Sequence, residues 1–292
     1  MKQIIAPVLS NEEILPGIHL LWAEAPEIAS EAEPGQFVMV RTSEGYDPLL
    51  RRPLSIHRVA PLSSPSQLAL LFAVVGRGTK WLAQRKRGDI IDLLGALGNG
   101  FEIRSRDLLL VAGGIGIAPL VALAERGLAE GSQVTLLLGA PTRTQLYPSH
   151  LLPAEVKSFF STEDGSAGRK GLVTDLLADF AAEAGQIFAC GPISMYNVMA
   201  SQGLQILRGN SVQVSMEVRM GCGFGACYGC ALETKRGLRL VCKDGPIFEL
   251  GEILWEGEKG GDEYGGYKEN RPSDEGKLRS HRHHPSSEAG GC

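Results

Sequence analysis

The chain has 292 residues, a hydrophobic share of 43% and a formal net charge of −4 at neutral pH. This length indicates two or three domains, and the slightly acidic balance excludes the strongly basic class of nucleic-acid binders. The longest apolar run, residues 108–124, is slightly short for a membrane span and contains three glycines and a proline. No long apolar core follows the first lysine, so we expect no signal peptide, no membrane partner and a cytoplasmic location.

Residues 1–102 are expected to be rich in β-strands. Short apolar runs recur at residues 17–25, 36–41 and 68–75, and turn signals such as Pro-Gly and Arg-Gly-Asp separate them. Several short strands at this spacing favour a small barrel or a sandwich.

From residue 103 onward, predicted strands alternate with predicted helices. The strands are expected at residues 107–114, 133–140, 156–165, 186–192 and 212–218. The helices are expected at residues 117–130, 172–184 and 193–204. Strands that alternate with helices indicate βαβ units and a parallel sheet.

Two turns in this second region are candidates for a nucleotide site. Gly113, Gly114 and Gly116 follow an apolar strand and open a helix, where free N–H groups can receive a pyrophosphate. The sequence Cys190-Gly191-Pro192 forms a second turn from strand to helix, at the sheet edge where ligands bind. A glycine turn that serves only the backbone, and a Cys190 that only fills space, remain alternatives.

A third candidate lies in the β-rich region, at residues 50–58 (LRRPLSIHR). Arg52 can pair with a diphosphate in bidentate fashion, and Ser55 can hydrogen-bond a ligand. Residues 76–79 (GRGT) form a glycine turn that allows close approach of a phosphate. A solvent-facing basic edge and a plain hairpin are the alternatives, and neither stretch identifies a ligand by itself.

The cysteines carry the strongest signal. Cys222, Cys227, Cys230 and Cys242 follow the pattern C-x4-C-x2-C-x11-C, which is typical of plant-type [2Fe–2S] sites. Four glycines, at positions 221, 223, 225 and 229, are expected to allow unusual dihedral angles and N–H groups that point at the sulfurs. A zinc ribbon would show two separated C-x2-C pairs, so zinc is the weaker alternative, and clustered thiols in a cytoplasmic protein disfavour disulfides.

Residues 256–292 have almost no apolar periodicity and are expected to be disordered. The tail contains His281, His283 and His284, which could hold a metal but more simply belong to a solvated segment, and Cys292, which we expect not to be a ligand.

In this order, the segments resemble the electron-transfer subunits of class 1B dihydroorotate dehydrogenases, which belong to the ferredoxin-reductase superfamily. The resemblance covers residues 3–253 and is most specific at residues 220–230 (MGCGFGACYGC) and 241–248 (VCKDGPIF). It implies a multidomain β plus α/β protein: a Greek-key FAD-binding barrel (1–102), a parallel α/β NAD-binding domain (103–208) and a [2Fe–2S] module (209–255). The tail (256–292), expected to be disordered, has no recognised counterpart in the family.

The resemblance also implies the residues of each site. FAD is expected at Arg52, Pro53, Leu54, Ser55, Leu71, Phe72, Ala73, Gly78 and Thr79. NAD is expected at Gly113, Gly114, Gly116, Pro119, Cys190, Gly191 and Pro192, and the cluster at the four cysteines. No catalytic residue is assigned. The family often has an arginine in place of Ala73 and a proline in place of Ala96, differences that affect one FAD contact and one loop.

The activity implied is an electron relay in pyrimidine biosynthesis. A separate FMN-containing subunit would oxidise dihydroorotate, and electrons would pass through the cluster and FAD to NAD+. The expected partner is that catalytic subunit, in a heterotetramer with two chains of each kind.

Two alternatives remain open at this point. One is an NAD(P)H oxidoreductase subunit of the same superfamily that serves ferredoxin, hydrogenase or sulfur reduction. The other is a non-redox nucleotide-binding module with structural zinc. The choice between NAD and NADP is also open, because no acidic residue ends the second predicted strand and Arg143 could face a 2′-phosphate.

Overall fold

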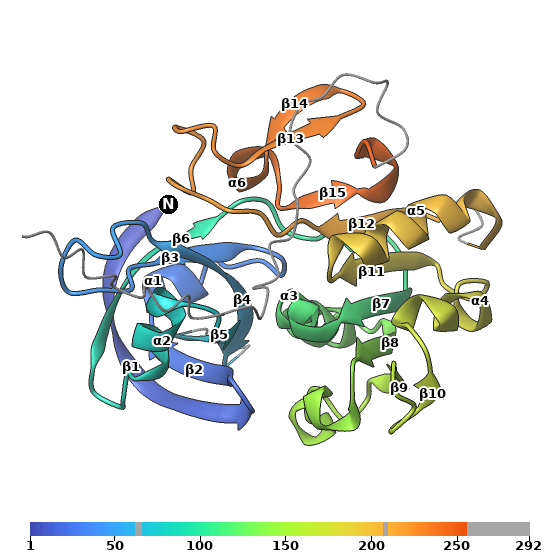
Figure 1. Ribbon diagram of the computed structural model, residues 1–292, viewed down its shortest axis with the longest axis horizontal. Coiled ribbons are helices and arrows are strands. Elements are labelled where there is room, and N and C mark those ends of the chain that lie inside the picture. Colours follow the sequence, from blue (N-terminus) through green and yellow to red (C-terminus); the bar gives the residue numbers. More distant parts are fainter. Residues whose placement is uncertain (62–65, 207–209, 256–292) are drawn as a thin grey trace, which may run out of the picture. The chain divides into compact units, whose positions relative to one another are not determined.

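The computed structural model describes residues 1–61, 66–206 and 210–255, all within a single unit that spans Met1–Glu258. The predicted disorder of residues 256–292, the tail histidines and Cys292 lie outside the described residues. Figure 1 shows a barrel, a layered α/β region and a smaller orange segment that carries the cysteines.

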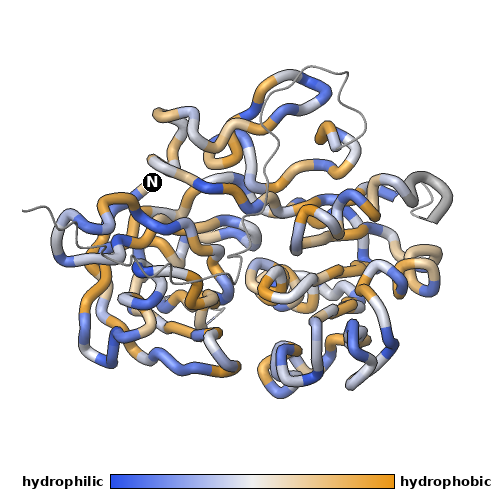
Figure 2. Tube along the Cα trace, viewed as in Figure 1, coloured by the Kyte–Doolittle hydropathy of each residue, from blue (hydrophilic) through white to orange (hydrophobic). Residues whose placement is uncertain are grey.

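The first part is a closed six-stranded barrel with the order β1-β2-β5-β4-β3-β6. Its elements are β1 (Lys2–Leu15), β2 (Ile18–Glu24), α1 (Pro26–Ala29), β3 (Phe37–Val40), β4 (Arg52–Ala60), β5 (Gln67–Ala73), α2 (Arg77–Ala83) and β6 (Ile90–Leu97). Burial alternates along β6, as expected for a strand with one face toward the core. Figure 2 shows hydrophobic stretches in both the barrel and the α/β region, with hydrophilic stretches between them.

The second part is a seven-stranded sheet with the order β10-β9-β8-β7-β11-β12-β15. Its strands are β7 (Asp107–Gly113), β8 (Gln133–Ala140), β9 (Lys157–Thr162), β10 (Arg169–Lys170), β11 (Gln186–Cys190), β12 (Val212–Ser215) and β15 (Ile247–Glu249). All neighbours pair in parallel except β12 and β15, which are antiparallel. Helices cover both faces, which explains why β7 and β11 are continuous apolar runs.

The helices of this part are α3 (Ile117–Ala129), α4 (Leu177–Phe180) and α5 (Ile193–Ile206). The predicted helix over residues 172–184 is shorter than expected, since residues 173–176 form a 3-10 turn and only Leu177–Phe180 is α-helical. The cysteine region adds a hairpin of β13 (Ala231–Thr234) and β14 (Gly237–Leu240), followed by α6 (Val241–Asp244).

The predicted barrel and parallel α/β architecture is confirmed. The domain boundaries at 102, 208 and 255 remain predictions, and two strands from beyond residue 208, β12 and β15, complete the sheet.

One hydrophobic core fills the barrel. A second lies between α3 and the sheet. A third joins the other face of the sheet to α5, to barrel residues such as Met39 and to the cysteine region. Among the described residues, no helix combines the length and the apolar character that a membrane crossing needs.

Candidate functional site

Strands β4 and β5 separate at the end where the flavin motif lies. Their pairing runs from Ala60 opposite Gln67 to Ile56 opposite Leu70. Beyond that point, residues 52–55 pair only with β3, and residues 71–73 pair only with β2. The facing backbone edges of these two segments are therefore available to the edge of a planar ring. Leu71 and Phe72 are buried in the core, so any contact they make with a flavin would come from the backbone.

The two arginines of the motif have different roles. Arg51 forms a bidentate ion pair with Asp92 at 2.9 and 2.7 Å and also donates to the backbone carbonyl of Met39. Within the described chain, Arg52 makes hydrogen bonds only to the neighbouring carbonyls of Leu50 and Arg51. Arg51 is thus committed to holding strands together, whereas the Arg52 guanidinium has N–H groups left for a ligand.

The predicted phosphate turn lies against Arg52. A Cβ atom added to Gly78 would lie 3.0 Å from Nε of Arg52 and 2.7 Å from Oγ1 of Thr42. Only glycine fits here, which satisfies the requirement for close approach of backbone to a phosphate. The Thr79 hydroxyl accepts from the N–H groups of Val75 and Gly76, so this side chain holds the turn itself.

The nucleotide turns surround a cavity of about 270 Å³ at the carboxyl ends of β7, β8 and β11. Gly113, Gly114 and Pro192 line the cavity, as do residues from the ends of β8 and β9. Gly116 packs directly against the backbone of Cys190, so these two turns are in contact behind the cavity. Pro119 is buried within α3 and is not among the lining residues. The cavity has the position that nucleotides take in open parallel sheets.

Two residues of this cavity were not predicted from the sequence. Glu163 comes directly after β9 and is an acidic residue among those that line the cavity. Thr174 is 3% exposed, lines the cavity and has a hydroxyl without a hydrogen-bond partner among the described residues. An acidic residue is expected at the end of the second strand of such a sheet, but here it follows the third. Arg143, the alternative for a 2′-phosphate, is not among the lining residues.

A third unpredicted residue, Glu217, lies beyond the end of β12 beside Cys190. The thiol of Cys190 is 3.9 Å from the Glu217 carboxylate. Burial is the main cause that raises the pKa of Cys190 well above its usual value, and the Glu217 charge adds to it. The shift of Cys190 favours an uncharged thiol at this end of the sheet. Glu217 belongs to no recognisable motif, so the sequence offers no signal for it.

The four predicted ligand cysteines are free thiols that come together in two pairs. Cys222 interacts with Cys227, and Cys230 interacts with Cys242. A two-iron cluster needs two such pairs, one for each iron. The donor set of four thiols in two pairs therefore fits a [2Fe–2S] cluster.

Backbone N–H groups point at the sulfurs, as the glycine-rich sequence predicts. Gly225 donates to Cys242 Sγ at 3.1 Å, and Ala226 donates to Cys222 Sγ at 3.2 Å. Burial raises the pKa of Cys222, but backbone N–H groups from Phe224, Cys227 and Ala226 outweigh it and lower the pKa to about 6. Burial and the neighbouring Cys230 raise the pKa of Cys242 to about 12, so a thiolate there needs a cation beside it.

The expected roles of the four glycines need a correction. Gly223 and Gly225 have φ of 84° and 89°, which favour glycine as predicted. Gly221 and Gly229 do not adopt positive φ. A Cβ added to them would lie 3.2 and 3.5 Å from Sγ of Cys227, which is tight at Gly221 and an ordinary contact at Gly229. A further residue with positive φ in this loop is Tyr228, at 59°. Two glycines thus set the backbone, and Gly221 keeps space beside a sulfur.

The cysteine loop packs on the barrel beside the flavin motif. A Cβ added to Gly223 would collide with the side chain of Met39, with Sδ at 2.9 Å. Met39 is fully buried on β3, opposite Pro53 of β4. The cysteine loop therefore packs on β3, the strand that pairs with the flavin-motif segment of β4.

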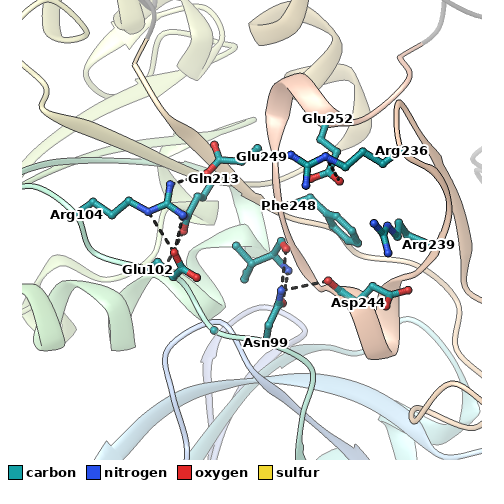
Figure 3. Close-up of a pocket in the computed structure, with 12 residues that line it drawn as sticks. Asn99, Glu102, Arg104, Gln213, Arg236, Arg239, Asp244, Phe248, Glu249 and Glu252 are labelled. Carbon is teal, nitrogen blue, oxygen red and sulfur yellow. Dashed lines mark hydrogen bonds and ion pairs between the residues drawn. The ribbon is translucent and has the colours of Figure 1, made fainter.

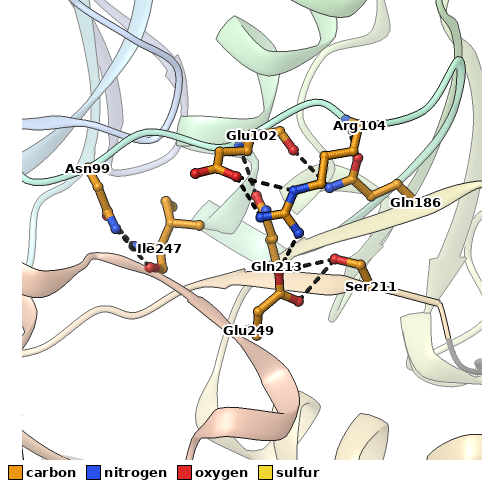
Figure 4. Close-up of polar contacts among 8 residues, drawn as sticks. All are labelled: Asn99, Glu102, Arg104, Gln186, Ser211, Gln213, Ile247 and Glu249. Atoms are coloured by element: carbon orange, nitrogen blue, oxygen red, sulfur yellow. Dashed lines mark hydrogen bonds and ion pairs between the residues drawn. The ribbon is translucent and has the colours of Figure 1, made fainter.

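A second cavity, of about 330 Å³, lies where the cysteine region meets the sheet (Figure 3). None of the predicted site residues lines it. Asn99 caps the open edge of β15, donating to the carbonyl of Ile247 at 3.2 Å and accepting its N–H at 3.0 Å. Arg104 bridges Glu102 and Glu249, and Gln213 and Gln186 accept backbone N–H groups of the same segment (Figure 4). These contacts fix the segment between barrel and sheet.

Comparison with known proteins supports the interpretation of each part. A family model described as the iron–sulfur cluster binding domain of dihydroorotate dehydrogenase B matches residues 217–254. An oxidoreductase NAD-binding domain model matches residues 110–201. A solved structure of an NADH-dependent reduced ferredoxin–NADP oxidoreductase is 30% identical, covers 87% of this chain and 91% of its own, and has a TM-score of 0.77. A ferredoxin NADP+ reductase from Neisseria gonorrhoeae, 19% identical over 71% of this chain and 91% of its own, has a TM-score of 0.55 and shows the fold alone.

The curated relatives share one name. The dihydroorotate dehydrogenase B (NAD(+)) electron transfer subunit of Bacillus cereus (strain G9842) is 35% identical over 85% of this chain and 96% of its own length. The subunit of the same name from Bacillus mycoides (strain KBAB4) is 34% identical with the same coverage. With the cysteine pairs, the glycine-lined cavity and the barrel already in place, the chain belongs to the family of dihydroorotate dehydrogenase B electron transfer subunits.

Proposed function

We propose that this chain passes electrons from an FMN-containing dihydroorotate dehydrogenase subunit to NAD+, through a [2Fe–2S] cluster and FAD. The observation that carries the proposal is the position of the cysteine loop, which packs on Met39 of β3, opposite Pro53 of the flavin motif on β4. When bound, FAD supplies the junction between the one-electron chemistry of the cluster and hydride transfer to NAD+.

The residues of the chain bind and position these groups. Arg52 has guanidinium N–H groups for the diphosphate of FAD, beside the Cβ-free surface of Gly78. The unpaired edges of residues 52–55 and 71–73 would hold the ring system. Gly113 and Gly114 bring backbone to the pyrophosphate of NAD+. The two thiol pairs described above would each hold one iron.

Glu163 supports NAD over NADP as the acceptor. Its carboxylate lines the nucleotide cavity after the third strand, where it can accept a hydrogen bond from a ribose hydroxyl. The same charge repels a 2′-phosphate. Among the described residues that line the cavity, there is no arginine or lysine that would favour the phosphorylated nucleotide.

The exposed face of the cysteine loop is the proposed contact with the catalytic subunit. Phe224 and Tyr228 are 48% and 63% exposed, and they flank the exposed Cys227. Aromatic side chains are enriched at protein–protein interfaces, and here they surround the proposed redox group. We infer a complex with two chains of each kind. The clustered free thiols also favour the reducing cytoplasm.

Reconstitution with the catalytic subunit tests the proposal. The two subunits are mixed anaerobically with dihydroorotate and NAD+, and NADH formation is followed by absorbance. We expect NADH to form only when both subunits are present, and no NADPH to form from NADP+ at matched concentration. Failure of a flavin- and iron-loaded chain to reduce NAD+ would refute the assignment of this partner.

The second candidate is a subunit that exchanges electrons with ferredoxin. It is supported by the structural likeness, at a TM-score of 0.77, to the NADH-dependent reduced ferredoxin–NADP oxidoreductase. The same cofactors would be present, so the partner decides between the two. Reduction of NAD+ by reduced ferredoxin, with no activity from the dihydroorotate subunit, would favour this candidate.

A further inference from the structure

Strand β4 continues past the flavin motif to a buried histidine. His57 is fully buried, two residues after Ser55. Its Nδ1–H donates to the backbone carbonyl of Ala118 in α3 at 2.8 Å. Since a carbonyl can only accept, Nδ1 carries the proton, and Nε2 accepts from the hydroxyl of Tyr147 at 3.0 Å. Both ring nitrogens of a barrel residue are therefore bonded to the NAD-binding region.

The next residue on β4 makes a second connection of the same kind. Arg58 forms an ion pair with Glu125 of α3 at 2.8 Å and donates to the carbonyl of Leu151. Both side chains of the ion pair are mostly buried, at 16% and 19% exposed. Two consecutive residues of one strand thus hold one helix at two points, Ala118 near its start and Glu125 two turns later. Figure 1 shows α3 next to β4, between the barrel and the sheet.

The two elements joined by these contacts, β4 and α3, also carry the proposed ligand-binding segments. In β4, the flavin motif at residues 52–55 comes just before His57. At the start of α3, the glycine turn at residues 113–116 is followed by Ile117 and then by Ala118. A helix rises about 1.5 Å per residue and a strand about 3.3 Å, so His57 and Ala118 each lie close to a ligand-binding segment.

We propose that His57 and Arg58 form a latch with Ala118, Tyr147 and Glu125 that sets the position of the NAD-binding turn at residues 113–116 relative to the flavin-binding strand. The inference rests on the proposed function and adds positioning residues for hydride transfer. Hydride transfer depends steeply on the distance and angle between donor and acceptor, so a small misplacement of the turn slows it. Burial lowers the pKa of His57 to about 3, so the latch keeps one protonation state at neutral pH.

The test removes the two hydrogen bonds of the latch with His57→Phe in the full chain loaded with FAD and cluster. NADH is mixed with the protein anaerobically, and the rate of flavin reduction and the long-wavelength charge-transfer absorbance are measured in one turnover. We expect the rate to fall by about tenfold or more and the charge-transfer absorbance to weaken. FAD content and the Kd of NADH should stay within about twofold of the wild-type values, because no binding segment is altered.

A second variant separates positioning from simple loss of stability. His57→Phe leaves the Tyr147 hydroxyl without its partner, and His57→Phe combined with Tyr147→Phe removes that buried group as well. The double variant should recover part of the Tm but none of the rate. Recovery of both would contradict a positioning role. If His57→Phe does not fold, Glu125→Gln tests the other half of the latch with the same readouts.

Gln186→Leu is the matched control. Gln186 is 1% exposed and makes two hydrogen bonds, to Arg104 and Glu102, at the opposite end of β11 from the Cys190 turn. We expect it to lower the Tm without changing the flavin reduction rate. A wild-type rate and charge-transfer absorbance in folded, FAD-loaded His57→Phe would overturn the latch. Absence of flavin and iron from the wild-type chain would instead refute the proposed function.

Discussion

The cysteine loop and the nucleotide cavity are both proposed sites for a redox group, but they are built differently. Three of the four cysteine ligands lie within nine residues, and the loop between them supplies its own N–H donors. The nucleotide cavity is lined by residues at the ends of several strands that are far apart in the sequence. A local site tolerates few substitutions within one segment, whereas a distributed site depends on how the segments are held together.

The largest effect is expected from removal of a cluster ligand. Cys227→Ala should abolish the iron–sulfur absorbance and remove about two irons per chain, while the flavin absorbance remains. The reason is that each iron depends on one pair of thiols, and Cys227 belongs to the pair with Cys222. Iron analysis and a visible spectrum check this. Retention of the iron would disprove the ligand assignment and with it the local character of the site.

A smaller loss should follow from crowding the loop. Gly223→Ala places a Cβ against the buried Met39 at a φ of 84°, which combines steric overlap with backbone strain. We expect a loss of about 1–3 kcal/mol in the free energy of unfolding and reduced iron content. Gly251→Ala is the control, because nothing among the described residues lies within 4 Å of its added Cβ. Equal iron content in the two variants would count against packing of the loop on the barrel.

The cofactor preference of the nucleotide cavity should depend on a single charge, that of Glu163. Glu163→Gln removes the negative charge that we propose to lie beside the ribose, and we expect the preference for NAD+ over NADP+, as a ratio of kcat/KM values, to fall by about tenfold. Arg143→Gln, outside the cavity lining, is the control and should leave the ratio unchanged. If Arg143→Gln shifts the ratio and Glu163→Gln does not, the nucleotide lies differently from our assignment.

A pH dependence of stability is expected from the contact between barrel and sheet. The pKa of His57 is lowered to about 3, so the unfolded state binds a proton below about pH 6.5 that the folded state does not. His57 therefore costs stability progressively as the pH falls from about 6.5 toward 3. The wild type should lose about 2 kcal/mol more than His57→Phe between about pH 7.5 and pH 5 in chemical denaturation. Parallel pH profiles would show that the histidine is not buried in its neutral form.

The fold could be predicted from the sequence, and the four cysteines could be proposed as cluster ligands, because both signals are local. Apolar runs that alternate with helical segments indicate the parallel sheet, and the cysteine spacing indicates the cluster. The glycine turn before Ile117 was recognisable for the same reason, since strand, turn and helix follow each other directly.

Other features depend on tertiary contacts that a single sequence does not display. Glu163 and Glu217 become site residues only because β9 and β12 end at the same edge of the sheet as the glycine turn. Arg51 and Arg52 are indistinguishable in the sequence, and only the position of Asp92 commits the first to structure. The role of His57 could not be predicted from the sequence, because its partners are a backbone carbonyl and a distant tyrosine.

An anaerobic titration with NADH tests the central claim most directly, that one chain joins a nicotinamide site, a flavin and a cluster. The purified chain, loaded with FAD and cluster, is reduced in steps while flavin and iron–sulfur absorbance are followed together. The account predicts that NADH bleaches both, with about three electron equivalents taken up per chain. Uptake of only about two electrons, with the iron–sulfur absorbance unchanged, would contradict it.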